Sequence, residues 1–165
     1  MKTVLLFGAG KSATVLIDYL LEQAITENWE IELVDADLKL AKSKIGLSQR
    51  AIAVSFNITD AGQRTKYIRH ADIVISLLPP DLHFLVAKDC VEYGKNLLTA
   101  SYVDDAIRNL QKDINSKKLL FLCEMGLDPG IDHMSAMKII DNIHSNGGHI
   151  TSFHSHCGGL VAPES

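Results

Sequence analysis

Residues 4–13, Val-Leu-Leu-Phe-Gly-Ala-Gly-Lys-Ser-Ala, decide the fold that this sequence predicts. A short apolar run ends at Phe7, Gly8 and Gly10 follow it, and a helical pattern begins after Ala13. The pattern G-x-G-x-x-A between a strand and a helix is typical of a turn that binds a dinucleotide pyrophosphate. In such a turn, Gly8 permits the sharp bend, Gly10 lets the backbone approach the phosphates, and Ala13 allows close packing of helix on strand.

Lys11 and Ser12 occupy variable positions of this loop, where a helix N-terminus offers free N–H groups and a partial positive charge to an anion. Ser12 can cap the helix or contact phosphate. A plain strand-to-helix turn also contains glycines, so the motif needs support from elsewhere. Asp35 provides it, because this acid ends the second apolar run at close to the roughly 20-residue spacing expected of a ribose-binding carboxylate.

The Asp35 carboxylate predicts NAD as the cofactor, with NADP as the second choice. A carboxylate here accepts hydrogen bonds from the ribose hydroxyls and repels the additional phosphate of NADP. The next residues are Ala36 and Asp37, so the arginine that accommodates that phosphate is missing.

Short β-branched apolar runs recur along the chain and alternate with longer amphipathic stretches. Such runs predict buried strands, and strands separated by helices form right-handed βαβ units in a parallel sheet. We therefore expect the α/β class, with a doubly wound parallel sheet in the order 3-2-1-4-5-6. The six expected strands cover residues 4–7, 31–34, 51–54, 73–77, 96–99 and 119–122.

The intervening stretches predict helices with one apolar stripe each. The first stripe is expected to contain Val15, Leu16, Tyr19, Leu20 and Ile25. Further helices are expected over residues 82–90, 103–114 and 131–146, and alternation over 150–156 predicts a half-exposed strand. A strand without a partner is a poor end for a protein, so we interpret the chain as an N-terminal fragment.

Composition excludes several classes of protein. The apolar fraction of 47% and the charged fraction of 22% are those of a globular domain. A net charge of −4 argues against binding to nucleic acid or to an anionic membrane. No apolar run suits a signal peptide or a membrane span. The three cysteines form no CxxC pair, which is typical of reduced thiols, so a cytoplasmic protein is expected.

Polar and turn residues follow each of the later strands, at positions 55–58, 76–80, 99–102 and 124–130. The carboxyl ends of parallel strands meet at one edge of a sheet, so these residues are expected to line one cleft. The alternative is that they are only the caps of successive helices.

Residues 124–133, Glu-Met-Gly-Leu-Asp-Pro-Gly-Ile-Asp-His, resemble the signature of the glutamate-forming saccharopine dehydrogenases, also called saccharopine reductases. Residues 157–160 and 162–164 resemble the block that follows in that family. Residues 76–80 and 99–102 match in type and order. The resemblance covers the whole chain, and its most specific part is the block from Leu127 to His133.

The resemblance implies an NAD(P)-binding Rossmann domain over residues 1–130. Residues 131–165 would begin a second, mostly antiparallel α+β domain that binds substrate and mediates homodimerisation. The implied enzyme of lysine metabolism converts saccharopine, NAD(P)+ and water to glutamate, 2-aminoadipate 6-semialdehyde and reduced cofactor. Carried over residue by residue, the saccharopine contacts are Ser101, Tyr102 and Asp128. The implied cofactor contacts are Gly8, Gly10, Lys11, Ser12, Ala13, Asp35, Asn57, Ile58, Leu77, Leu78, Thr99 and Leu127.

Asp128 is the candidate catalytic residue, because a carboxylate beside the secondary amine favours its cationic form and holds it over the nicotinamide. Tyr102 can donate its hydroxyl to a substrate carboxylate, with Ser101 beside it. The alternative role for Asp128 is a helix N-cap, since Asp before Pro is a frequent cap signature. His133 either faces the cleft or packs against the fold.

A metal site is not expected. His149, His154, His156 and Cys157 lie close in sequence, but no second cluster completes a tetrahedral site. Cys157 alone is more typical of a small buried side chain. After Lys118, Lys138 is the one basic residue besides histidine, so arginines for the three carboxylates of saccharopine are missing. We therefore expect residues 1–165 to bind dinucleotide without turning over saccharopine.

Two other functions remain open. A carboxynorspermidine-type dehydrogenase shares the reductive chemistry of an imine, but an amine-rich substrate demands acidic pocket residues. A regulatory NAD(H)-sensing module needs Gly8, Gly10 and Asp35 but not the Ser101, Tyr102 and Asp128 group.

Overall fold

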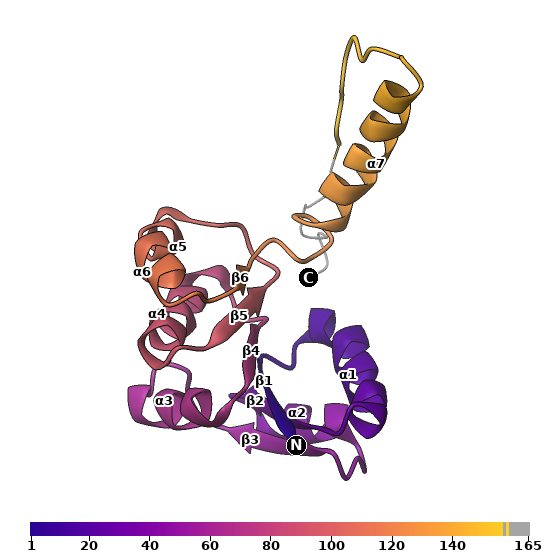
Figure 1. Cartoon of the computed structure of the whole chain (residues 1–165). Helices are drawn as coiled ribbons and strands as arrows, with labels where there is room; N and C mark the ends of the chain where they lie inside the picture. Colours follow the sequence, from indigo (N-terminus) through magenta and orange to yellow (C-terminus); the bar gives the residue numbers. More distant parts are fainter. Residues whose placement is uncertain (157, 159–165) are drawn as a thin grey trace.

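The computed structural model describes residues 1–156 and 158. Its centre is one six-stranded sheet in which every neighbouring pair is parallel, with the order β3-β2-β1-β4-β5-β6 (Figure 1). The expected α/β class and strand order are therefore confirmed. The strands are β1 (Lys2–Phe7), β2 (Trp29–Asp35), β3 (Ala51–Ser55), β4 (Ile73–Ser76), β5 (Asn96–Thr99) and β6 (Phe121–Leu122).

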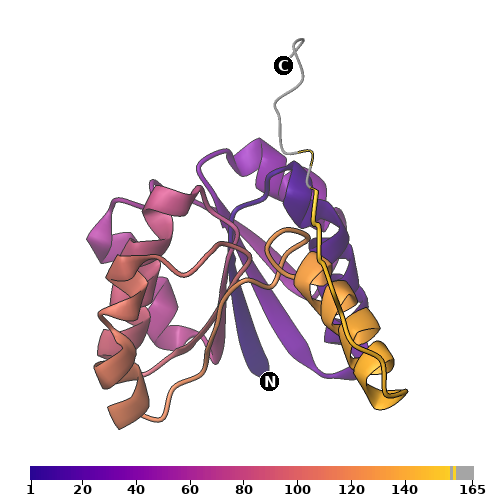
Figure 2. The same cartoon turned by 90° about the horizontal axis from the view of Figure 1, so that it is seen from above.

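Helices connect the strands and cover both faces of the sheet, which Figure 2 shows edge-on. The α-helices are α1 (Thr14–Thr26), α2 (Leu38–Ile45), α3 (Ala61–His70), α4 (His83–Tyr93), α5 (Asp105–Arg108), α6 (Gln111–Ser116) and α7 (Ile131–Ser145). Two short 3-10 helices, η1 (Lys11–Ala13) and η2 (Pro80–Leu82), lead into α1 and α4.

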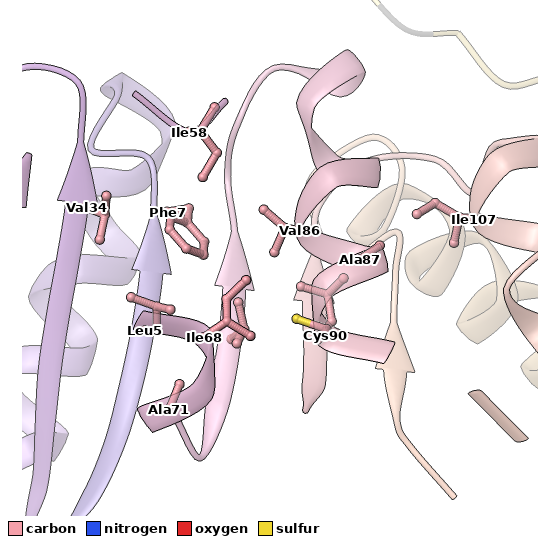
Figure 3. Close-up of a cluster of buried hydrophobic side chains, with 12 residues drawn as sticks. Leu5, Phe7, Val34, Ile58, Ile68, Ala71, Val86, Ala87, Cys90 and Ile107 are labelled. Carbon is pink, nitrogen blue, oxygen red and sulfur yellow. The ribbon is translucent and has the colours of Figure 1, made fainter. Parts of the chain in front are cut away.

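The hydrophobic core has two halves, one on each face of the sheet. Alternate residues of β1 point to opposite faces, so Leu5 and Phe7 pack towards α3 and α4, while Val4 and Leu6 pack towards α1 and α2. All four are at most 4% exposed, as expected of a central strand covered on both sides. Figure 3 shows the half beneath α3 and α4.

The structure corrects the expected stripe of α1. Val15, Tyr19 and Ile25 are more than half exposed, whereas Ile17, Leu20 and Ala24 are buried. Apolar residues occur almost all around this helix, so periodicity alone did not select the buried side. The helix expected over 103–114 is two short helices, α5 and α6, and the last strand retains only two residues.

The segment after the sheet departs further from expectation. Helix α7 extends away from the sheet and buries none of its residues (Figure 1). Residues 150–156 form no strand, since no described strand pairs with them. Ile150 is half-buried and residues 151–156 are exposed. Among the described residues, no helix has the length and apolar character that crossing a membrane requires.

A buried ion pair joins α3 to α4. Arg64 Nε lies 2.6 Å from Asp89 Oδ2, and each side chain is 7% exposed. Arg64 Nη1 also donates to the carbonyl of Ile58 at 2.6 Å. The pair therefore anchors the loop after β3, which approaches the carboxyl edge of the sheet.

Replacing Asp89 with alanine leaves the Arg64 guanidinium buried without its partner. We expect a loss of about 3–5 kcal/mol in the free energy of unfolding, measured by urea denaturation. Lys2→Ala is the control, since the Lys2–Asp72 pair is exposed and its loss costs under about 1 kcal/mol. Equal effects of the two substitutions would contradict the anchoring role.

Candidate functional site

The turn after β1 is forced against β4. Gly8 has a φ of +101°, and a Cβ there would lie 2.7 Å from the carbonyl oxygen of Leu77. The Gly8 amide donates to the carbonyl of Val34 at 2.8 Å, and the Leu77 amide donates to Phe7 at 2.8 Å. Three neighbouring strand ends thus meet at a position that only glycine fills without strain.

The loop beyond Gly8 leaves an anion-binding surface. Within the described residues, the backbone N–H groups of Gly10, Lys11 and Ser12 have no hydrogen-bond acceptor. These amides lie where η1 leads into α1, so the positive end of the helix dipole adds to them. Of the two alternatives for Ser12, the capping role is wrong, because neither η1 nor α1 has a side-chain cap, and the phosphate contact stays a prediction.

Asp35 fixes the loop from the end of β2. Its Oδ2 accepts from the Ala9 amide at 2.7 Å, and its Oδ1 accepts from the Asp37 amide at 2.8 Å. Each carboxylate oxygen has two lone pairs, so both retain capacity for a further donor such as a ribose hydroxyl. The acid therefore both shapes the loop and lines the site.

A cavity of about 520 Å³ opens between these strand ends. Its size and apolar walls suit a nucleotide, and the unpaired amides and Asp35 supply the polar contacts. The arrangement thus fits a bound dinucleotide. Seven of the expected cofactor residues line this cavity: Gly8, Gly10, Asp35, Asn57, Ile58, Leu77 and Leu78.

The other expected cofactor residues lie outside this cavity. Lys11 and Ser12 are exposed, and Ala13 is buried in the half of the core that packs against α1 and α2. Thr99 lines a neighbouring cavity instead. Leu127 is 75% exposed and lines neither.

The neighbouring cavity has a volume of about 340 Å³ and collects the expected substrate residues. Ser101, Tyr102 and Asp128 all line it, although they come from two different strand ends. The Tyr102 hydroxyl donates to Asp128 Oδ1 at 2.6 Å. In this structure the Tyr102 proton is therefore directed to Asp128, and its donation to a substrate carboxylate stays a prediction.

Asp128 does not cap the following helix. Helix α7 begins at Ile131, and the Gly130 amide donates to Asp132 Oδ1 at 2.8 Å. The N-cap alternative for Asp128 is therefore wrong. Asp132 also accepts from His133 Nδ1 at 2.8 Å, and the His133 side chain is 64% exposed.

His83 is a site residue that the sequence analysis did not identify. This first residue of α4 is 5% exposed and lines the smaller cavity. Its Nδ1 lies 2.8 Å from Ser76 Oγ, and its Nε2 lies 2.7 Å from Ser101 Oγ. Burial lowers the pKa of His83, against the raising effect of the Asp104 and Asp81 charges.

The smaller cavity also has a distinct electrostatic character. It is lined by two carboxylates, Asp104 and Asp128, and neither cavity has a lysine or arginine in its lining within the described chain. Asp104 Oδ1 accepts from the Ile107 amide at 2.7 Å, so this acid caps α5. Cys123 also lines the cavity, and burial raises the pKa of its thiol.

Over residues 1–156 and 158, no three His, Cys, Asp or Glu side chains come together as metal ligands would. His149, His154 and His156 are in the described part of the chain, whereas Cys157 lies outside it. The family-like block over 159–164 also lies outside the described residues.

Comparison with known proteins gives consistent matches. The family model for the saccharopine dehydrogenase NADP binding domain matches residues 4–122, and the model for the saccharopine dehydrogenase C-terminal domain matches residues 126–165. The cofactor in the first description is NADP, so the expected nicotinamide dinucleotide is supported, while NAD as the first choice is not.

Among curated proteins, the saccharopine dehydrogenase [NADP(+), L-glutamate-forming] of Saccharomyces cerevisiae is 38% identical over 99% of this chain and 36% of its own length. The alpha-aminoadipic semialdehyde synthase of Arabidopsis thaliana is 38% identical over 97% of this chain and 17% of its own length. The chain thus spans about a third or less of the length of these relatives.

Solved structures agree. Apo saccharopine dehydrogenase (L-Glu forming) from Saccharomyces cerevisiae matches 99% of this chain and 36% of its own, with a TM-score of 0.85 and 36% identity. A putative myo-inositol dehydrogenase from Sinorhizobium meliloti covers 87% of this chain and 42% of its own at a TM-score of 0.63 and 18% identity, which shows a shared fold. The phosphate loop, the two cavities and these matches together establish that the chain belongs to the saccharopine dehydrogenase family.

Proposed function

We propose that this chain forms the dinucleotide-binding part of an oxidoreductase that acts on the CH–NH bond of saccharopine. Oxidation gives an imine, which water hydrolyses to glutamate and 2-aminoadipate 6-semialdehyde. One observation carries the proposal: a cavity with unpaired amides lies directly beside a cavity that contains a Tyr–Asp pair. Consecutive residues join them, since Pro79 and Leu82 line the larger cavity while Pro80 and His83 line the smaller one. A substrate in the smaller cavity therefore lies next to a dinucleotide in the larger.

The negative charge of Asp128 suggests the roles of the residues that line the smaller cavity. When bound, the dinucleotide accepts hydride from the carbon of the CH–NH bond. The Asp128 carboxylate attracts the cationic secondary amine and holds a proton there or removes it. Tyr102 donates to Asp128 and so keeps the carboxylate turned into the cavity.

The carboxylates of saccharopine need cationic partners from outside the two cavities. None of the four arginines lines either cavity in the described chain. Arg64 is paired with Asp89, Arg69 donates to the Tyr93 hydroxyl, Arg50 donates to Asn28, and Arg108 lines a separate hollow beside α5 and α6. We therefore propose that residues 1–165 bind dinucleotide but do not turn over saccharopine alone. Saccharopine-dependent formation of reduced cofactor by this chain would contradict this.

One observation favours the second candidate, a carboxynorspermidine-type dehydrogenase. The smaller cavity has two carboxylates and no cation in its lining, which suits an amine-rich substrate. Family membership supports saccharopine instead, and the Asp104 carboxylate already has a structural partner. Activity of the complete polypeptide encoded by its gene, with saccharopine and with carboxynorspermidine, discriminates between the two.

We also propose that this chain favours NAD over NADP, unlike the relatives named for NADP. The Asp35 carboxylate is fixed at the ribose edge by two backbone amides, and Asp37 lies beside it. A 2′-phosphate placed there meets like charge. Lys39, which follows on α2, is exposed and is the nearest cation along the chain.

Substitutions at Gly8 and Gly10 distinguish an effect on stability from an effect on dinucleotide binding. Gly8→Ala forces a Cβ against Leu77 and a positive φ, so we expect a loss of about 1–3 kcal/mol in the free energy of unfolding. Gly10→Ala places its Cβ in open space at a φ of −61°, so stability changes by less than about 0.5 kcal/mol. Affinity for NADH, measured by fluorescence titration, should still fall at least about tenfold. Unchanged affinity of Gly10→Ala would show that the loop does not approach the pyrophosphate.

Asp35→Asn removes the charge while the amide oxygen can still accept from Ala9. We expect the affinity for NADPH relative to NADH to rise by about tenfold, or about 1.4 kcal/mol. Asp37→Asn is the matched control, because this acid caps α2 and should alter the ratio less. The proposal fails if the unmodified chain binds NADPH tenfold more tightly than NADH.

Asp128→Asn tests the proposed proton-handling residue in the complete polypeptide. The amide oxygen can still accept from Tyr102, so the change removes charge and basicity alone. We expect kcat with saccharopine to fall about a hundredfold, while the Kd for the dinucleotide changes little. Asp132→Asn, four residues along the chain, is the control. An unchanged kcat would exclude Asp128 from the mechanism.

A further inference from the structure

Three strand-end hydroxyls surround one buried imidazole. Ser76 ends β4, Thr99 ends β5, and Ser101 lies just beyond, while His83 reaches between them from the start of α4. Thr99 Oγ1 is 3.3 Å from Nδ1 and 3.4 Å from Nε2, so it contacts the ring without selecting a nitrogen. The two short contacts, from Ser76 to Nδ1 and from Ser101 to Nε2, therefore decide the proton arrangement.

Ser76 sets the direction of these hydrogen bonds. Its side chain is fully buried, and within the described residues its hydroxyl contacts no partner except His83 Nδ1. If Nδ1 carried a proton, it would donate to Ser76, and the Ser76 proton would be buried without an acceptor. Ser76 therefore donates to Nδ1, which must be unprotonated.

The unprotonated Nδ1 determines the hydrogen bond on the other side of the imidazole ring. A neutral imidazole with an unprotonated Nδ1 carries its proton on Nε2, which then donates to Ser101 Oγ. The Ser101 hydroxyl proton cannot return to the ring and is available to the cavity. Ser101 thus differs from Tyr102, whose proton is donated to Asp128.

We propose that His83 is a positioning residue: as the neutral Nε2–H tautomer, held by Ser76, it makes Ser101 a hydrogen-bond donor towards an anionic group in the smaller cavity. That this group is a carboxylate of the substrate rests on the proposed function. The cavity lining offers no lysine or arginine within the described chain, so an oriented hydroxyl is a suitable local donor to a carboxylate.

The tautomer can be measured on this chain without any ligand. In ¹⁵N-labelled protein at neutral pH, long-range ¹H–¹⁵N correlation distinguishes the two tautomers, and His83→Gln identifies the signals of His83. We expect a protonated Nε2 and an unprotonated Nδ1. Ser76→Ala should increase the population of the Nδ1–H tautomer. Ser55→Ala is the control and should leave it unchanged, because Ser55 ends β3 and donates its hydroxyl to the Ala36 carbonyl. A dominant Nδ1–H tautomer or an imidazolium in the unmodified chain would overturn the proposal.

Kinetics of the complete polypeptide test the role of the oriented hydroxyl. His83→Leu removes the ring donor, whereas His83→Gln can place an amide N–H near the position of Nε2. We expect His83→Leu to raise KM for saccharopine about tenfold with less than about twofold change in dinucleotide Kd, and His83→Gln to restore most of the loss. Equal effects of both variants on KM would overturn the positioning role. Absence of saccharopine turnover in the unmodified protein refutes the proposed function alone, since the tautomer measurement is independent of it.

Discussion

The structure depends on one close backbone approach, where Gly8 lies against the Leu77 carbonyl at the carboxyl edge of the sheet. Any Cβ at this position would push β1 away from β4, and the loop would lose the conformation that Asp35 holds through the Ala9 amide. These contacts use the amides of Gly8 and Ala9, whereas the amides of Gly10, Lys11 and Ser12 have no acceptor in the part of the chain that the structure describes. Folding of three strand ends therefore creates an anion-binding surface.

The two cavities divide the chemistry along this edge. One presents backbone amides and a carboxylate, which suits the phosphates and ribose of a nucleotide, and the other presents side-chain hydroxyls, an imidazole and two acids. The segment between β4 and α4 separates them, and His83 is the first helical residue after it. A single connection thus contributes residues to the lining of both cavities.

Several features could be predicted because local patterns determine them. The β-branched runs and the intervening amphipathic stretches predicted the parallel sheet and its order, since right-handed crossover connections allow few alternatives. His83 could not be identified in this way, because a histidine at the start of a helix has no periodic or spacing signal until Ser76 and Ser101 come beside it. The prediction of the buried side of α1 was wrong because apolar residues occur all around this helix. The prediction of a strand over 150–156 was wrong because an alternating pattern does not by itself provide a strand to pair with.

The sequence by itself determined the glycine loop, the acid after the second strand and the family signature, because each depends on residues close together in the chain. It also placed Ser101, Tyr102 and Asp128 at strand ends that share one edge. Only the tertiary structure decided that Tyr102 donates to Asp128, that Asp132 rather than Asp128 takes the Gly130 amide, and that one buried imidazole joins two serines. The direction of a hydrogen bond depends on which other donors and acceptors are available in the folded core. Those neighbours are determined only when segments that are distant in the sequence pack together.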